Sequence, residues 1–141
     1  MPAEDSPAVL FVCTFNRVRS PMAAGMMRLL GVPADSCGLE PGEEVDPLAA
    51  AVMAEIGANL SDHAPAQLDD LLAERRFSRI VALSDEAWSR LQPRPELAAL
   101  HWLVPDPTQG EGSRDTRLED YRLTREAFRT LIHDHFGPAQ A

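Results

Sequence analysis

Residues 8–31 read AVLFVCTFNRVRSPMAAGMMRLLG, and three patterns follow one another within them. The first is an unbroken apolar run over residues 8–12, which is typical of a strand buried on both faces of a parallel sheet. The last is a helical spacing of apolar residues that begins near Ser20-Pro21, where proline is favoured in a first helical turn. Between them lies a short loop that starts at Cys13. This order places the amide groups of the loop at a helix N-terminus, where an anion binds favourably.

Similar patterns continue along the rest of the chain. Strands are expected at 34–37, 79–83 and 100–104, and helices at 47–56, 66–75, 85–91 and 115–135. Strands that alternate with helices predict a parallel α/β sheet with crossover connections. No internal repeat or linker divides the sequence, so residues 1–141 are expected to form one domain with a single sizeable core.

The loop after the first strand contains the residue types that nucleophilic chemistry on a phosphoryl group needs. Cys13 lies at the mouth of a predicted nest of backbone N–H groups, whose positive potential favours the reactive thiolate. Arg19 is suited to hold two oxygens of a bound phosphate bidentately. Asn16 tolerates the left-handed backbone that such a curled loop requires, and Ser20 is placed to donate a hydrogen bond to the thiolate. The other loop residues expected to surround the anion are Thr14, Phe15, Arg17 and Val18.

A simpler interpretation of these residues also exists. Free cysteine is among the most buried residue types, so Cys13 alone would fit an ordinary core position. Arg19 alone would fit a solvated helix start. The position of both between a buried strand and a Ser-Pro helix start favours the functional interpretation.

The amino-acid composition indicates which partners and which cellular compartment to expect. A formal net charge of −9 argues against nucleic acid or membrane as a partner, because either requires a basic face. No apolar run approaches a membrane span, and the first five residues contain two acidic and no basic residues, where a signal peptide is basic. We therefore expect a cytoplasmic protein. The chain has two cysteines, Cys13 and Cys37, which are too few for a disulfide framework or a thiolate metal site.

The sequence resembles the low-molecular-weight protein tyrosine phosphatase family, which includes thioredoxin-coupled arsenate reductases. The resemblance covers nearly the whole chain. It is carried by the blocks VLFVC at 9–13, Asn16, RSPMA at 19–23, DSCG at 35–38, Asp62-His63, SDE at 84–86 and Asp106-Pro107. It implies a four-stranded parallel sheet in the order 2-1-3-4 with helices on both faces.

The resemblance also implies roles for residues outside the loop. Asp106 would be the general acid that protonates the leaving oxygen and later activates water, an effect typically worth about 10²–10⁴-fold. By itself, Asp106-Pro107 would more often be only a turn. Ser36 and His63 would join Asn16 and Ser20 in a hydrogen-bond network that stiffens the anion loop. Asp85 is expected to cap a helix first and to support the loop second.

Three departures from the family pattern affect specificity. Phe15 stands where the family normally has glycine, and Val18 replaces a common second loop cysteine. Thr108-Gln109 follow the Asp-Pro pair, where phosphotyrosine-directed members carry aromatic residues. These departures weaken the expectation of phosphotyrosine specificity.

Three functions stay open, with phosphomonoester hydrolysis through a cysteinyl-phosphate in front. The C-terminal third is more similar to the arsenate reductase branch, but residues 83–92 contain none of the relay cysteines of that branch. Arsenate reduction would therefore need an external thiol such as glutathione or mycothiol, and Cys37 is expected to be a packing residue. The third alternative is a non-catalytic oxyanion-binding module. The expected partner is a phosphorylated small molecule or phosphoprotein, or arsenate with that thiol, and neither a metal nor another cofactor is implied.

Overall fold

The computed structural model describes residues 4–5, 7–42 and 44–137. Its strands are β1 (Glu4–Asp5), β2 (Val9–Cys13), β3 (Ala34–Gly38), β4 (Arg75–Arg76), β5 (Arg79–Ala82) and β6 (Leu100–His101). Its helices are α1 (Arg19–Leu29), α2 (Pro47–Ala54), α3 (Leu68–Glu74), α4 (Asp85–Leu91) and α5 (Arg114–Phe136), with 3₁₀ turns at Pro95–Leu97 and Pro107–Gln109. Strands and helices alternate as the sequence predicts.

The main sheet has four parallel strands in the order β3-β2-β5-β6. Numbered along the chain among themselves, these strands stand in the order 2-1-3-4, so the expected topology is confirmed. The central strand β2 is buried along its whole length and pairs with β3 on one side and β5 on the other. The loop that follows the carboxyl end of β2 therefore starts between the ends of two neighbouring strands.

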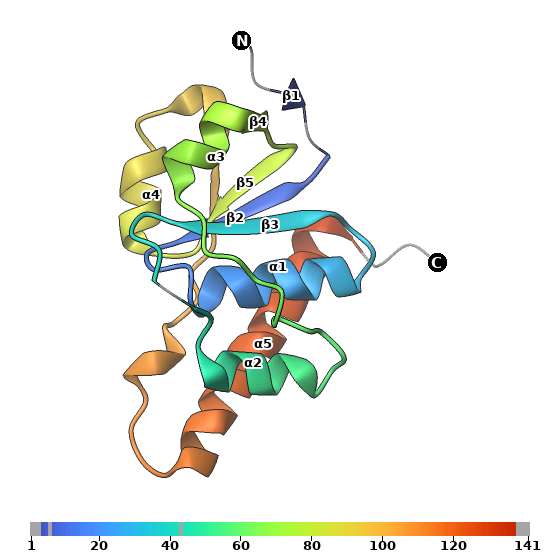
Figure 1. The fold of residues 1–141 in the computed structure, drawn as a ribbon, viewed down its shortest axis with the longest axis vertical. Helices are drawn as coiled ribbons and strands as arrows, with labels where there is room; N and C mark the ends of the chain where they lie inside the picture. The colour runs from blue at the N-terminus through green and yellow to red at the C-terminus, as the bar shows by residue number, and fades with distance from the viewer. Residues whose placement is uncertain (1–3, 6, 43, 138–141) are drawn as a thin grey trace.

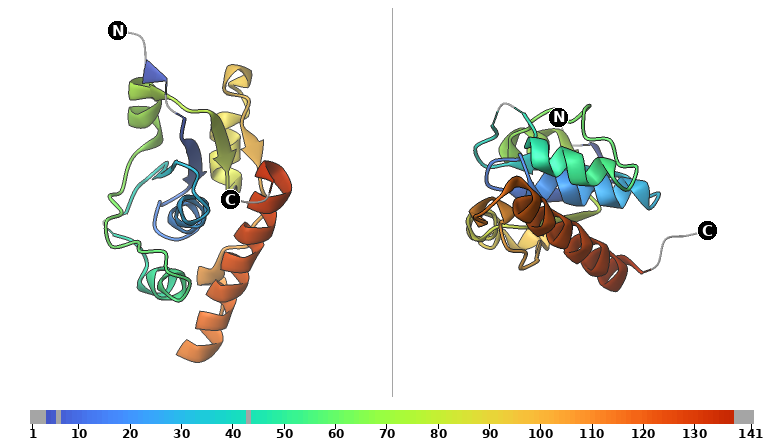
Figure 2. Two further views of the ribbon diagram at one scale, coloured as in Figure 1. Left: turned by 90° about the vertical axis from the view of Figure 1, so that its right-hand side faces the viewer. Right: turned by 90° about the horizontal axis from the view of Figure 1, so that it is seen from below.

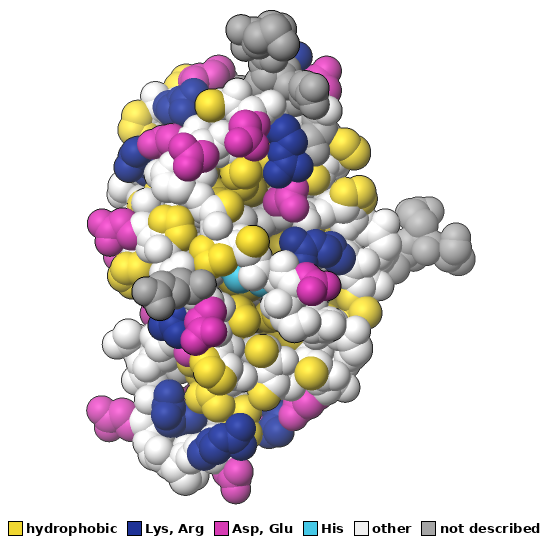
Figure 3. All heavy atoms as spheres, viewed as in Figure 1, with side chains coloured by type: hydrophobic (Ala, Val, Ile, Leu, Met, Phe, Trp, Pro, Cys, Tyr) yellow, Lys and Arg dark blue, Asp and Glu magenta, His cyan; other side chains and the backbone are white. Residues whose placement is uncertain are grey.

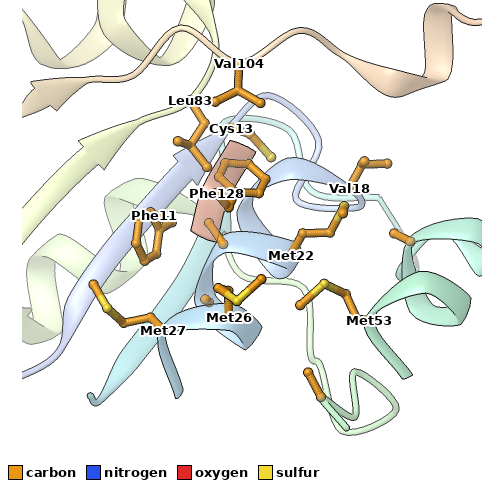
Figure 4. Packing of buried hydrophobic residues seen from close by; sticks show 14 of the residues in the cluster. Phe11, Cys13, Val18, Met22, Met26, Met27, Met53, Leu83, Val104 and Phe128 are labelled. Atoms are coloured by element: carbon orange, nitrogen blue, oxygen red, sulfur yellow. The ribbon is translucent and has the colours of Figure 1, made fainter. Parts of the chain in front are cut away.

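Helices cover both faces of the sheet, with α1, α2 and α5 on one side and α3 and α4 on the other (Figures 1 and 2). Side chains of a strand point alternately to opposite faces, so Phe11 and Cys13 contact the first layer while Leu10 and Val12 contact the second. Figure 4 shows Cys13 at the end of β2 above the apolar side chains of α1 and α5. Because β2 is buried on both faces, its sequence is a continuous apolar run and not an alternation of apolar and polar residues.

Two features of the sheet differ from the sequence prediction. The expected last strand over 100–104 is too long, because β6 ends at His101. Its neighbour β5 ends at Ala82, which is paired with His101, so the residues that follow His101 have no strand beside them. Leu103 is accordingly 80% exposed. The short parallel pair of β1 with β4 was not predicted.

The face drawn in Figure 3 carries interspersed acidic and basic side chains, with apolar side chains gathered over α2 in its lower half. No helix in the described part of the chain has the length and apolar character needed to cross a membrane.

Candidate active site

The anion loop, residues 13–19, connects the end of β2 to the start of α1. Cys13 is the last residue of the strand and is only 4% exposed, and Arg19 is the first residue of the helix. Figure 4 shows Leu83 and Val104 beside Cys13, at the same edge of the sheet. Ligands of open α/β sheets bind at the carboxyl ends of the strands. The loop therefore lies where the fold favours a site.

The backbone carbonyls of the anion loop are held from outside by a neighbouring bracing segment, residues 39–42, and by Asp46 and His63. The hydrogen bonds run from Leu39 N to Cys13 O (3.2 Å), Glu40 N to Thr14 O (2.9 Å), Gly42 N to Phe15 O (2.9 Å), His63 Nε2 to Asn16 O (3.0 Å) and Asp46 N to Arg17 O (2.8 Å). Each carbonyl from residue 13 to residue 17 is thereby fixed.

This bracing determines where the amide groups of the loop point. In a planar trans peptide the C=O of one residue and the N–H of the next point in opposite directions. The N–H groups of residues 14–18 therefore point away from the bracing segment. Within the described residues they have no hydrogen-bond acceptor. Unpaired amides grouped in this way form a nest that binds an oxyanion.

Asn16 holds the curl of the loop from inside. Its backbone has φ 56°, the left-handed conformation that the sequence predicted for it. Its buried side chain donates to Ser20 Oγ (2.9 Å) and to Ser36 Oγ (3.0 Å), and its Oδ1 accepts from the amide of Ala66 (3.0 Å). One asparagine thus ties the loop to α1, to β3 and to the chain before α3.

The four residues expected in the supporting network are hydrogen-bonded together. Besides the bonds of Asn16, His63 Nδ1 lies 3.5 Å from Ser36 Oγ. Burial lowers the pKa of His63 from its usual value of 6.5, which favours the neutral ring. Because Asn16 O is an acceptor, the neutral ring carries its proton on Nε2. Whether these contacts matter for activity stays a prediction.

Ser20 lies directly beside the sulfur of the predicted nucleophile. Its hydroxyl oxygen is 2.9 Å from Cys13 Sγ and 3.1 Å from the carbonyl oxygen of Cys37. Both Ser20 and Cys13 are buried. Ser20 is therefore in position to donate to a thiolate, as the sequence suggested.

Arg19 and Asp106 are brought together from distant parts of the chain. Arg19 Nη1 donates to Leu83 O (3.0 Å) and Val104 O (3.2 Å), while its Nη2 lies 3.9 Å from Asp106 Oδ2. Anchoring by Nη1 leaves the Nε and Nη2 edge of the guanidinium available for a bidentate contact. On Asp106, Oδ1 accepts from the Thr108 amide (2.9 Å) and hydroxyl (2.7 Å), so Oδ2 stays available for proton transfer.

These residues line one cavity of about 680 Å³. Its base is formed by Cys13 and Arg19, and its walls by other residues of the anion loop together with Gly42, Asp46, Glu86, Asp106, Thr108 and Gln109. The structure thus brings the three predicted catalytic residues to one cavity. Of the predicted loop residues, Asn16 and Ser20 lie outside its lining, where they support the loop from behind.

Some supporting residues were not identified from the sequence. Gly38, at the end of β3, packs so closely on the loop that a Cβ there would lie 2.8 Å from Asn16 N and 2.9 Å from Thr14 O. Asp46 bonds the loop through its amide, caps α2 through Oδ1 and accepts from Tyr121 through Oδ2. No local pattern identifies these residues, because their partners are distant in the chain.

The expectation that Asp85 caps α4 was wrong. Ser84 is the N-cap, and its hydroxyl accepts from the amide of Ala87 (3.1 Å). Ser84 Oγ also accepts a hydrogen bond from Thr14 Oγ1 (3.0 Å), so this serine, not Asp85, supports the loop. Asp85 is instead the first helical residue, where it faces His101 at 3.7 Å. Serine is at least as good a cap as aspartate, and it lies one residue earlier.

Cys37 is oriented away from the anion loop. It is paired with Val12 in the sheet and packs with Leu10 and Val12 in the layer beneath α3 and α4, whereas Cys13 packs in the opposite layer. Both thiols are free and buried. Burial, assisted by the nearby Cys13, raises the pKa of the Cys37 thiol far above its usual range. Cys37 is therefore a packing residue of the core, as expected.

The sequence and the fold both match known proteins. Residues 8–134 match the family described as low molecular weight phosphotyrosine protein phosphatase. The chain is 30% identical over 129 residues to an arsenate reductase of Staphylococcus xylosus, covering 89% of this chain and 98% of the relative.

Two solved structures resemble most of the chain. A low molecular weight protein tyrosine phosphatase from T. tengcongensis is 29% identical, with a TM-score of 0.68 over 93% of this chain and 98% of that one. An arsenate reductase in the phosphate-binding state is 26% identical, with a TM-score of 0.67 over 92% and 98%. The match over residues 8–134 and this shared fold place the chain in the low molecular weight phosphotyrosine protein phosphatase family.

Proposed function

We propose that this protein is a cysteine-dependent phosphatase that hydrolyses phosphomonoesters through a cysteinyl-phosphate intermediate. The observation that supports this most is the loop itself: Cys13 lines a cavity together with Arg19 and with loop residues whose backbone is braced and whose amides are unpaired among the described residues. Donors fixed before the reaction stabilise charge that develops in the transition state.

In the first step, the Cys13 thiolate attacks phosphorus and an S–P bond forms. The P–O bond to the leaving group breaks, and the leaving oxygen takes a proton from the Asp106 carboxyl. Arg19 and the loop amides hold the three remaining phosphoryl oxygens. Without the proton, an alkoxide or phenoxide leaves poorly.

In the second step, the Asp106 carboxylate takes a proton from a water molecule, which attacks phosphorus. The S–P bond then breaks, its electron pair returns to Cys13, and inorganic phosphate leaves. Ser20, 2.9 Å from the sulfur, is placed to stabilise the departing thiolate. No other residue is needed to balance the two steps.

The test is the hydrolysis of p-nitrophenyl phosphate by the wild-type protein and by Cys13→Ser. A burst of nitrophenol is expected from wild type, because nitrophenol is a good leaving group and the intermediate should form faster than it breaks down. Cys13→Ser should lose turnover and still bind inorganic phosphate through the loop amides. Retained turnover in Cys13→Ser would exclude this mechanism.

Arsenate reduction is the second candidate, because the relative from Staphylococcus xylosus is an arsenate reductase. Arsenate is a tetrahedral oxyanion like phosphate and would fit the same loop. The Cys13 thiolate would displace one arsenate oxygen as water and form an S–As bond. An external thiolate would then attack the Cys13 sulfur, so that arsenite leaves with the electron pair and a mixed disulfide remains.

This reaction would need an external thiol because of where the two cysteines lie. The chain has only Cys13 and Cys37, and these pack on opposite faces of the sheet. Arsenate-dependent oxidation of glutathione or mycothiol, lost in Cys13→Ser, would favour this second function. Its absence, together with turnover of the aryl phosphate, would favour the phosphatase.

A further inference from the structure

Phe15 is an exposed aromatic residue at the rim of the active-site cavity. Its side chain is 56% exposed, and it is one of four large apolar residues with such exposure among the described residues. Isolated exposed apolar side chains are common and need no explanation. Phe15 differs because it lines the cavity that contains Cys13 and Arg19.

Most residues that line the cavity have polar or charged side chains, and Phe15 and Val18 are the two large apolar side chains among the described ones. Cys13, Arg19 and the amides form its base, and Phe15 is the only aromatic residue among the described residues that line it. The Asp106 side of the cavity presents the polar residues Thr108 and Gln109. A site with an anion-binding base and one apolar wall suits molecules that carry negative charge at one end and an apolar group at the other.

The backbone beneath Phe15 is fixed. Its carbonyl accepts from Gly42 N (2.9 Å), and the carbonyls of Thr14 and Asn16 on either side are also bonded. The ring is therefore held at the rim by a braced loop and has little backbone entropy to lose when a ligand packs on it.

We propose that Phe15 is the specificity-determining residue of this site and packs against the aromatic ring of an aryl phosphate whose phosphoryl group lies in the anion loop. This inference rests on the proposed function for its substrate class. The aromatic wall of the cavity then comes from the loop that carries the nucleophile, and the segment after Asp106 supplies polar contacts.

Binding of two phosphonates tests this independently of turnover, because neither is hydrolysed. Benzylphosphonate and methylphosphonate share the anionic group and differ in the ring, and titration calorimetry gives the ratio of their dissociation constants. Aromatic pairs contribute about two- to tenfold in affinity beyond the burial of area. We expect wild type to favour benzylphosphonate by at least this factor and Phe15→Ala to lose most of the preference.

Two further variants sharpen the comparison. Phe15→Leu keeps an apolar side chain without a ring face, and its preference should fall between those of wild type and Phe15→Ala. Leu29→Ala removes another exposed apolar residue, on α1 and outside the cavity lining, and should keep the wild-type ratio. A loss of affinity for both phosphonates by the same factor in Phe15→Ala would mean that Phe15 only shapes the loop, and would overturn the inference.

Wild-type affinity for both phosphonates in Phe15→Ala would overturn it as well. Failure of the proposed function is distinguishable from both outcomes. A protein that binds phosphonates but releases no nitrophenol from p-nitrophenyl phosphate lacks the phosphatase activity, while the ring preference still reports on Phe15.

Discussion

The hydroxyl oxygen of Ser20 lies 2.9 Å from the sulfur of Cys13 and also 3.1 Å from the carbonyl oxygen of Cys37. A serine hydroxyl has one proton and donates to one of these acceptors at a time. Hydrogen bonds to a charged acceptor are the stronger ones. When Cys13 is a thiolate, we therefore expect Ser20 to turn its proton from Cys37 O to the sulfur.

Ser20→Ala should slow turnover of an aryl phosphate by about ten- to a hundredfold, because a hydrogen bond to a charged group is lost. Both thiolate attack and thiolate departure should suffer, so burst rate and steady-state rate should both fall. Stopped-flow measurement of nitrophenol release checks this. Ser89→Ala, at an exposed serine of α4, is the matched control and should behave as wild type. Wild-type rates in Ser20→Ala would mean that the contact has no catalytic role.

Asp106→Asn should reduce hydrolysis most for substrates with poor leaving groups, by about 10²–10⁴-fold, and little for activated ones. The amide keeps the size of the side chain but has no acidic proton to give to the leaving group. The measurement is the rate of hydrolysis of a series of aryl phosphates, plotted against the pKa of the leaving phenol for wild type and for the variant. Asp115→Asn, at an exposed acid in the first turn of α5, controls for the change of charge. Equal losses across the series would instead indicate that Asp106 positions Arg19.

Gly38→Ala should damage the anion loop. The added methyl group would approach the backbone of Asn16 and Thr14 to less than 3 Å, and backbone atoms cannot move aside as a side chain tip can. Overpacking of this kind costs about 1–3 kcal/mol. We expect lower stability in urea unfolding together with weaker phosphate binding.

Gly31→Ala is a useful comparison for that variant. Gly31 has φ +88° and open space around it, so alanine there should cost about 1–2 kcal/mol through backbone strain alone. It should leave phosphate binding intact, because Gly31 lies at the far end of α1 from the loop. Equal phosphate affinity in both variants would contradict the role of Gly38.

Thioredoxin and its reductase alone should not support arsenate reduction by this protein. A disulfide requires Cα atoms within about 7 Å and Cβ vectors that converge, but Cys13 and Cys37 pack on opposite faces of the sheet. Arsenate-dependent oxidation of NADPH is the measurement. Strong activity in wild type that disappears in Cys37→Ala would show a two-cysteine reductase, and a rearrangement of β3 would then be required.

The neutral state of His63 predicts a pH dependence of stability. Burial lowers the pKa of His63 in the folded protein below 6.5, so the unfolded chain binds more protons in this range. The contribution to stability is complete above about pH 6.5 and is lost as pH falls through the lowered folded-state pKa. Urea unfolding at several pH values between 7.5 and 5 should show a steeper loss for wild type than for His63→Gln. His133→Gln, on an exposed part of α5, should keep the wild-type slope.

The first strand, the anion loop and α1 could be predicted because their pattern is local. The apolar run over residues 8–12 indicates a strand buried on both faces, and the Ser20-Pro21 start indicates the helix; the observed strand is Val9–Cys13. Their order alone places Cys13 and Arg19 at the ends of one short loop. Asn16 could be assigned its left-handed backbone for the same reason, because few residues adopt that conformation without strain.

The bracing of the loop was decided by the tertiary structure. The carbonyl of Phe15 is held by Gly42, that of Asn16 by His63, and the loop backbone packs on Gly38. These contacts join segments that lie far apart in the sequence, and each depends on how the strands are ordered in the sheet. A local pattern contains no information about such neighbours.

The opposite orientation of the two cysteines is a second feature that the tertiary structure decides and the sequence does not. The sequence gives two thiols and a strand around each, but the register of β2 with β3 decides that Cys37 faces the layer of Val12 and not that of Cys13. A slip of one residue would reverse that orientation, because side chains alternate along a strand. The residues proposed for the nucleophilic chemistry thus lie within residues 13–20, whereas the separation of Cys13 from the second thiol depends on the pairing of two strands.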